Sequence, residues 1–164
     1  MTSPLWPPFA ECTDYDAFVA GGGALATLAG VADADVSDIF RRAARDFAAG
    51  RFRDAEAGFL LVATLDVWHY DAWVGLGHCL ARRLALRDAL FCFLKAGVAR
   101  PSDPRPPFYA AHAYQRLGYP DKALVSLRAV LRLTAQFHAD DDHAGIRRAT
   151  RVMIDAIQSS NGTE

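Results

Sequence analysis

The segment RRLALRDALFCFLKAGVAR, residues 82–100, decides the fold, because two other segments of the chain match it in pattern. Aligned with AAGRFRDAEAGFLLVATLD, residues 48–66, and RLGYPDKALVSLRAVLRLT, residues 116–134, it places Ala55, Ala89 and Ala123 at one position, 34 residues apart. Three further sets repeat at this spacing: Gly50, Leu84 and Gly118; Phe59, Phe93 and Leu127; and Ala43, Gly77 and Ala111. Small residues at two fixed phases, with a large apolar residue four positions after the second, allow antiparallel helices to interlock closely.

A 34-residue period with this pattern is that of the tetratricopeptide repeat (TPR). The middle unit fills the expected positions with Trp73, Leu76, Gly77, Leu80, Ala89, Phe93, Ala96 and Pro101. We therefore expect an all-α solenoid of three TPR units, with helix pairs at about 36–66, 70–99 and 106–135. Two residues depart from the pattern. Leu84 stands where a glycine usually turns the helix pair, and Pro107 stands where the third unit should carry a large apolar residue.

The chain divides into three parts. Residues 1–35 form an N-terminal helical arm with an expected role in dimerisation, residues 36–158 form the TPR domain with its C-terminal capping helix, and residues 159–164 form a disordered tail. The acidic run ADDDH, residues 139–143, suits the start of the capping helix, from about 143 to 158. The apolar stripe expected to cover the last repeat consists of Ile146, Ala149, Val152, Met153, Ala156 and Ile157.

Composition narrows the functional classes. The chain has 164 residues, of which 52% are hydrophobic, and a net charge of −1. Residues 1–38 hold six acidic side chains and no Lys or Arg, and the basic excess elsewhere is too dilute for a nucleic-acid surface. The three cysteines form no C-x-x-C pair, which argues against a disulfide framework and a zinc knuckle. A reducing cytoplasm is the expected compartment.

Three consecutive glycines, Gly21 to Gly23, interrupt an uncharged segment of the arm. A phosphate-binding loop would need a Lys and a Ser or Thr directly behind them, and the uncharged run 17–32 is shorter than a membrane span requires. A bent or broken helix is therefore favoured. Because glycine accepts positive φ, the arm can turn here and pack on its own repeats or on a second copy. We expect a homodimer in which this packing involves Phe18, Val19, Leu25 and Leu28.

The first helix of each pair should line the concave face of the solenoid. Repeat phase assigns the following residues to this groove: Phe40, Ala44, Phe47, Val74, His78, Arg82, Phe108, Tyr109, His112, Gln115 and Arg116. An apolar and aromatic floor with a few cationic and hydrogen-bonding groups suits an extended peptide. Burial between helices is the alternative for Phe40 and Phe47, because aromatic stripes at helical spacing usually belong to a core.

Catalysis and cofactor binding find little support in the sequence. His78 and His112 share one repeat phase, but no carboxylate or cysteine accompanies them at metal-ligand spacing. No nucleophile stands at a plausible spacing from a base. We therefore expect a protein that is not an enzyme and requires neither a metal ion nor a nucleotide or other cofactor.

The order of these parts resembles the class II type III secretion chaperones, the low-calcium-response H group. The resemblance rests on F-x-x-G-G-G-x-x-A-x-L, from Phe18 to Leu28, followed by FAAGRFRDAEAGF, LDVWHYDAWVGLG and DPRPPFYAAHAYQRLG. It covers about residues 15–135. The triple glycine makes it specific, since that element is not a general TPR feature. This chain departs from the family by carrying His and Ala at several polar groove phases.

The resemblance implies a bacterial cytoplasmic chaperone with a role in virulence. Such a protein binds hydrophobic translocators, with an N-terminal cargo segment in the concave groove, and prevents their aggregation or membrane insertion before export. It also implies self-association through the N-terminal region and a groove lined by Phe47, Val74, His78, Phe108, Tyr109 and His112. The alternatives are a chaperone for another secretion component, such as a needle subunit, and a general TPR peptide-binding scaffold. A clamp for the carboxyl terminus of a heat-shock chaperone is disfavoured, because it needs Lys and Asn where Phe40, Ala44, Val74 and His78 stand.

Overall fold

The computed structural model describes residues 24–135 and 143–161. Within these ranges the chain is helical and contains no strand, as the sequence predicts. The helices are α2 (Leu25–Leu28), α3 (Asp33–Ala48), α4 (Phe52–Leu65), α5 (Tyr70–Arg82), α6 (Leu86–Ala99), α7 (Arg105–Arg116), α8 (Pro120–Leu133) and α9 (Ala144–Asn161).

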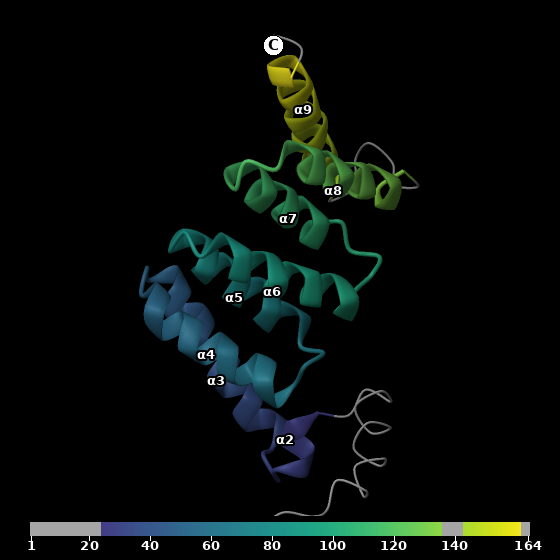
Figure 1. The fold of residues 1–164 in the computed structure, drawn as a ribbon. Coiled ribbons are helices and arrows are strands. Elements are labelled where there is room, and N and C mark those ends of the chain that lie inside the picture. The colour runs from purple at the N-terminus through teal and green to yellow at the C-terminus, as the bar shows by residue number, and fades with distance from the viewer. Residues whose placement is uncertain (1–23, 136–142, 162–164) are drawn as a thin grey trace, which may run out of the picture.

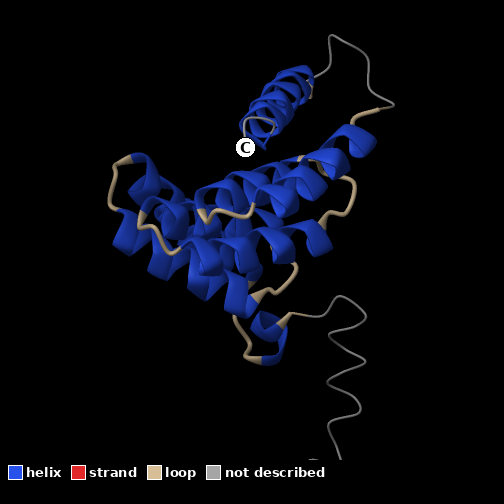
Figure 2. Ribbon diagram, turned by 45° about the horizontal axis from the view of Figure 1, so that its top comes forward, coloured by secondary structure: helices blue, strands red, loops and turns tan. Residues whose placement is uncertain are grey.

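Three antiparallel helix pairs, α3–α4, α5–α6 and α7–α8, stack in chain order, with α2 at one end and α9 at the other (Figure 1). Short loops join the helices within and between the pairs (Figure 2). The predicted TPR solenoid is confirmed. Its limits shift slightly, because α3 begins at Asp33, inside the predicted arm, and α9 runs to Asn161. Residues 159–161 are therefore helical and not part of a disordered tail.

The repeated small residues allow the helices of a pair to approach closely. Ala55, Ala89 and Ala123 have no exposed surface. A Cβ atom added at Gly77 of α5 would lie 2.5 Å from the ring of Phe93 in α6, so this glycine leaves room for that ring. The 34-residue pattern thus reflects a steric requirement of each helix pair.

The turn between the two helices of a pair has the same backbone conformation in all three pairs. Gly50, Leu84 and Gly118 have φ values of +76°, +66° and +77°. In each turn the next N–H donates to the carbonyl oxygen five residues earlier: Arg51 to Asp46, Ala85 to Leu80 and Tyr119 to Tyr114. This is the glycine-favouring end of a helix, so Leu84 adopts the backbone of the glycine that it replaces.

The second departure from the pattern does not disturb its helix. Pro106 and Pro107 lie in the first turn of α7, where backbone N–H groups have no partner within a helix and proline is tolerated. The Asp103 carboxylate accepts a hydrogen bond from the Arg105 backbone N–H at 2.9 Å and so fixes the start of α7.

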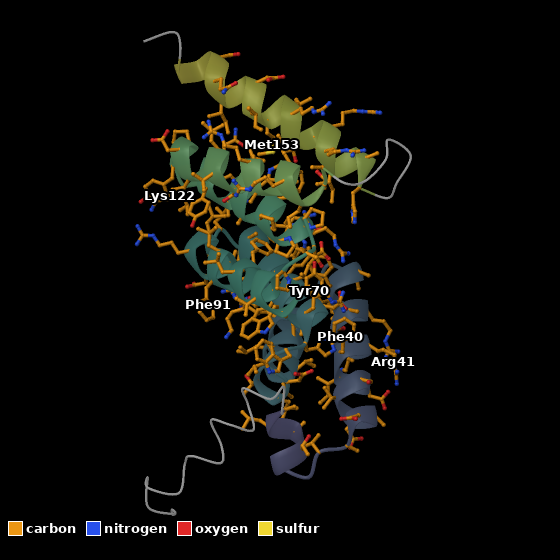
Figure 3. All side chains as sticks on the ribbon, turned by 90° about the vertical axis from the view of Figure 1, so that its right-hand side faces the viewer. Phe40, Arg41, Tyr70, Phe91, Lys122 and Met153 are labelled. Atoms are coloured by element: carbon orange, nitrogen blue, oxygen red, sulfur yellow. The ribbon has the colours of Figure 1, made fainter. Side chains whose placement is uncertain are left out.

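Helix α9 covers the last pair, as predicted, but only part of the predicted stripe makes the contact. Ile157 is buried against Leu127, and Met153 points toward the helices below α9 (Figure 3). The predicted stripe is wrong at Val152, which is 63% exposed, and at Ala156, which is also exposed. Thr150 is buried instead, because its hydroxyl donates to the Ile146 carbonyl oxygen at 2.7 Å and thus needs no external partner.

Parts of the N-terminal prediction lie outside the described residues, namely Phe18, Val19 and the glycines 21–23. Leu25 and Leu28 both belong to α2, where Leu25 is half-buried. Ala26 is buried in the core that α3–α6 share. The acidic run 140–142 also falls outside the described ranges.

Candidate functional site: a groove along the first helices

Aromatic rings from α3, α5 and α7 form a continuous row across the solenoid. We call it the aromatic row, and its members are Phe47, His78, Tyr109, Phe108 and His112. The centroids of Phe47 and His78 lie 6.4 Å apart, and those of His78 and Tyr109 lie 4.5 Å apart. Phe108 lies 6.2 Å from Tyr109 and 4.7 Å from His112. Most of these contacts are edge-to-face, the favoured geometry of aromatic pairs.

A pocket of about 240 Å³ opens beside this row. We call it the groove pocket, and its lining residues are His78, Ala81, Leu86, Phe93, Phe108, Tyr109, His112, Ala113 and Arg116. Its volume lies below the roughly 300–1,000 Å³ typical of small-molecule sites. A pocket of this size and apolar lining fits side chains that project from an extended peptide.

The structure brings only some of the predicted groove residues together. His78, Phe108, Tyr109, His112 and Arg116 line the groove pocket. Arg82 and Gln115 are exposed and lie outside the lining. The remaining four, Phe40, Ala44, Phe47 and Val74, are partly buried against the core.

Phe40 and Phe47 illustrate two outcomes of that burial. The Phe40 ring lies 5.6 Å from Phe59 and 4.9 Å from His69, which agrees with the alternative of burial between helices. Phe47 also packs on the core, yet its ring continues the aromatic row toward His78.

Repeat phase missed the small Ala113 of α7 and two large residues of the groove pocket, Leu86 and Phe93. Both belong to α6, a second helix, and second helices were expected to lie outside the groove. The Phe93 ring reaches past Gly77 and contacts both His78 and Tyr109, at centroid distances of 5.5 Å and 5.4 Å. A glycine opposite a repeated phenylalanine was the available signal, because it lets the ring pass between the first helices.

The titratable rings of the groove pocket are neutral at pH 7. Burial lowers the pKa of His78, and the nearby Arg82 guanidinium lowers it further. Burial alone lowers the pKa of His112 and is also the main reason that the pKa of Tyr109 is raised. These groups can therefore serve as hydrogen-bond partners for a peptide without adding charge.

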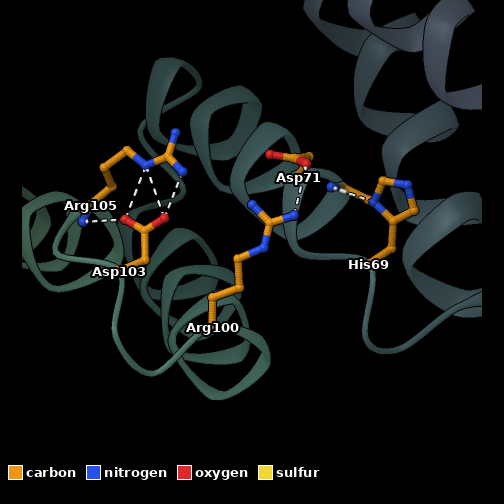
Figure 4. A network of polar contacts seen from close by, with 6 residues as sticks. His69, Asp71, Arg100, Asp103 and Arg105 are labelled. Carbon is orange, nitrogen blue, oxygen red and sulfur yellow. Dashed lines mark hydrogen bonds and ion pairs between the residues drawn. The ribbon is translucent and has the colours of Figure 1, made fainter. Parts of the chain in front are cut away.

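At the opposite end of the first helices, charged side chains form ion pairs with one another (Figure 4). Arg105 holds the Asp103 carboxylate with a contact of 2.6 Å, and Arg100 lies 3.5 Å from Asp71. Although burial acts in the opposite direction, the hydrogen bonds from Arg105 keep the pKa of Asp103 below its usual value. The guanidinium groups of Arg100 and Arg105 also lie 4.2 Å and 5.3 Å from the Tyr70 ring.

Within the part of the chain that the structure describes, no group of three His, Cys, Asp or Glu side chains could hold a metal ion. Burial raises the pKa of Cys79 to about 11 and that of Cys92 to about 12, so both thiols stay protonated and unreactive. None of the described helices combines the length and apolar character needed to cross a membrane.

The two curated relatives found by sequence share one name, low calcium response locus protein H. No protein-family model matches the chain. The low calcium response locus protein H of Yersinia pestis is 27% identical over 105 residues, which make up 63% of this chain and 61% of that protein. The chain thus spans about three fifths of the length of the curated relatives it matches.

Solved structures share the fold. A type III secretion complex from Aeromonas hydrophila aligns with a TM-score of 0.83 at 23% identity, over 92% of this chain and 99% of that one. The Yersinia enterocolitica chaperone SycD, in complex with a peptide of the translocator YopD, aligns with a TM-score of 0.75 at 21% identity. The alignment covers 80% of this chain and 98% of that one. PcrH of Pseudomonas aeruginosa, in complex with the chaperone binding region of PopD, aligns with a TM-score of 0.75 at 23% identity. The alignment covers 80% of this chain and 97% of that one. The resemblance to type III secretion chaperones is confirmed.

Proposed function

We propose that the protein is a type III secretion chaperone that binds hydrophobic translocator proteins through an extended segment held along the aromatic row. The groove pocket carries this proposal, because it presents an apolar cavity bordered by neutral hydrogen-bonding rings and no catalytic group. Structures with the same fold have been solved with a peptide of YopD and with the chaperone binding regions of PopD and PopB. Apolar side chains of the segment fill the groove pocket, and the polar ring atoms bond its backbone.

The physical need for such a chaperone follows from its cargo. A translocator must later insert into a membrane, so its apolar segments would aggregate or insert early if they stayed exposed. Masking these segments requires affinity and no chemical step. The chaperone therefore needs neither a nucleotide nor a metal ion. It acts in the bacterial cytoplasm, before export of the translocators, and it is a homodimer.

Truncation of the aromatic row tests the function. Phe108→Ala and Tyr109→Ala should each weaken binding of the translocators encoded beside this protein by about 1–3 kcal/mol, because central aromatic anchors dominate such interfaces. Isothermal titration calorimetry measures the affinity, and circular dichroism checks that helix content is kept.

Phe91→Ala is the matched control for these variants. Phe91 is 57% exposed on α6 and does not line the groove pocket, so its loss should leave the affinity unchanged. Wild-type affinity in both groove variants would contradict the proposal. Copurification of a needle subunit in place of translocators would instead assign the protein to a different cargo of the same apparatus.

A further inference from the structure

Positive charge borders the groove pocket on one side. Arg116 lines it, and the Arg116 Nη1 atom donates to the Ala81 carbonyl oxygen at 3.3 Å. Arg82 follows Ala81 in the chain, and its guanidinium lies 5.6 Å from the Phe52 ring. Arg82 lies four residues after His78 in α5, so the two side chains share one face of that helix. The two arginines share one repeat phase and so lie on neighbouring first helices, α5 and α7.

The lining of the groove pocket contains no Asp or Glu. Helix α7 contains no Asp or Glu, and the one acid of α5, Asp71, lies at the opposite end and pairs with Arg100. On the neighbouring pair, Asp46 contacts Arg51 at 2.5 Å and Glu56 contacts Arg83 at 2.6 Å.

Arg82 and Arg116 themselves have no ion-pair partner among the described residues. Asp88, in the first turn of α6, is exposed and does not line the pocket. The described groove therefore offers two guanidinium groups with unused donors beside an apolar cavity.

We propose that this groove selects segments in which an acidic residue adjoins an apolar anchor, with the anchor in the groove pocket and the carboxylate at Arg82 and Arg116. The inference rests on the proposed function and deepens it by naming the class of peptide. A guanidinium matches a carboxylate in geometry and charge, whereas a Lys or Arg at the same place in the peptide would be repelled. Such exposed pairs set specificity more than total affinity.

A random library of twelve-residue peptides displayed on phage supplies the test. It is selected against the full chain, against the double variant Arg82→Gln/Arg116→Gln, and against the control Arg87→Gln/Arg128→Gln. The control changes the net charge equally, and its two arginines are exposed on the second helices α6 and α8. Phe108→Ala shows which of the selected peptides depend on the groove.

We expect the wild type and the control to enrich apolar residues with an Asp or Glu within two positions. The double variant should keep the apolar preference and lose the acidic one. For a synthetic peptide taken from the selection, Glu→Gln should weaken binding to the wild type by about two- to fivefold and leave binding to the double variant unchanged. Raising the salt concentration should shrink this difference, because exposed charges are screened.

The outcomes separate the two levels of the proposal. Groove-dependent peptides without acidic enrichment, or acidic enrichment that survives in the double variant, would overturn the charge preference and leave the proposed function standing. A selection that yields no peptide sensitive to Phe108→Ala would remove the groove itself as the binding site, and the charge preference with it.

Discussion

Leu84 holds a backbone conformation that its own side chain opposes. Its φ of +66° lies in the left-handed region, where a residue with a Cβ atom is strained by about 1–2 kcal/mol. The side chain is 68% exposed, so burial offsets little of this strain. Leu84→Gly should therefore raise the free energy of unfolding by about 0.5–1 kcal/mol, after the flexibility that glycine adds to the unfolded chain. Urea denaturation of both proteins measures this difference in unfolding free energy.

The reverse exchange is the control for this residue. Gly118 has φ of +77° and no atom within 4 Å of an added Cβ, so Gly118→Leu should destabilise through backbone strain alone. If Leu84→Gly unfolds at the wild-type midpoint while Gly118→Leu is destabilised, the turn at Leu84 has relaxed and the strain argument is wrong there.

His78 makes stability depend on pH. Because its folded pKa lies below the ordinary value of 6.5, the unfolded chain binds this proton more readily than the folded chain does. The stability that neutral His78 provides is complete above pH 6.5 and declines as the pH falls from there toward the folded pKa. His78→Gln should make the unfolding free energy depend less steeply on pH below 6.5. An equally steep decline in this variant would assign the effect to other groups.

At the scale of elements, the α5–α6 pair depends on the contact between a glycine and a ring. A Cβ at Gly77 would lie 2.5 Å from Phe93, whereas one at Gly97 of α6 would meet its nearest atom, Pro106 Cβ, at 3.7 Å. Gly77→Ala should thus cost about 1–2 kcal/mol through overpacking, and Gly97→Ala should stabilise by about 0.5–1 kcal/mol through helix propensity. Chemical denaturation compares the two.

Binding gives a second measure of that contact, because Phe93 also lines the groove pocket. Gly77→Ala should displace the ring and weaken peptide binding, whereas Gly97→Ala should not. Equal stabilisation by both substitutions would show that Phe93 yields without cost, and the interlocking account of the repeat would then fail for this pair.

The elements also show where sequence reasoning works and where it stops. Three copies of one steric pattern predicted the helix pairs, because each copy supports the interpretation of the others. The sequence marked Leu84 as a departure from that pattern, and only the structure shows that Leu84 adopts the glycine-like turn. Helix α9 has no second copy, and a hydropathy stripe cannot tell that Thr150 satisfies its hydroxyl within its own helix while Val152 stays in water. Phe93 was placed in the core and also lines the groove pocket, since a large ring can serve both.

At the scale of the whole molecule, the two ends of the solenoid differ. Helix α9 covers the C-terminal pair. At the N-terminal pair, α3 and α4 border a hollow of about 920 Å³ whose lining includes Ile39, Arg42, Arg45 and Leu61. Leu61 is 46% exposed there. The outer face of a terminal repeat is usually polar. Three arginines and two aspartates line this hollow, and Asp46 is paired with Arg51, so its apolar groups and its excess of arginine suit a partner that is apolar and acidic. The N-terminal arm has that composition.

This asymmetry motivates the prediction of a homodimer with the arm in its interface. Leu25→Asp combined with Leu28→Asp would place charge against an apolar partner. This should weaken the dimer by several kcal/mol and give monomers. Light scattering across a dilution series measures the mass. The control Val125→Asp/Val152→Asp adds the same charge at side chains that are each 63% exposed, and it should remain dimeric. Peptide binding in the groove should survive in the monomer if the two surfaces are separate.

A wild type that stays monomeric at high concentration, or an arm variant that stays dimeric, would refute the arm-mediated dimer.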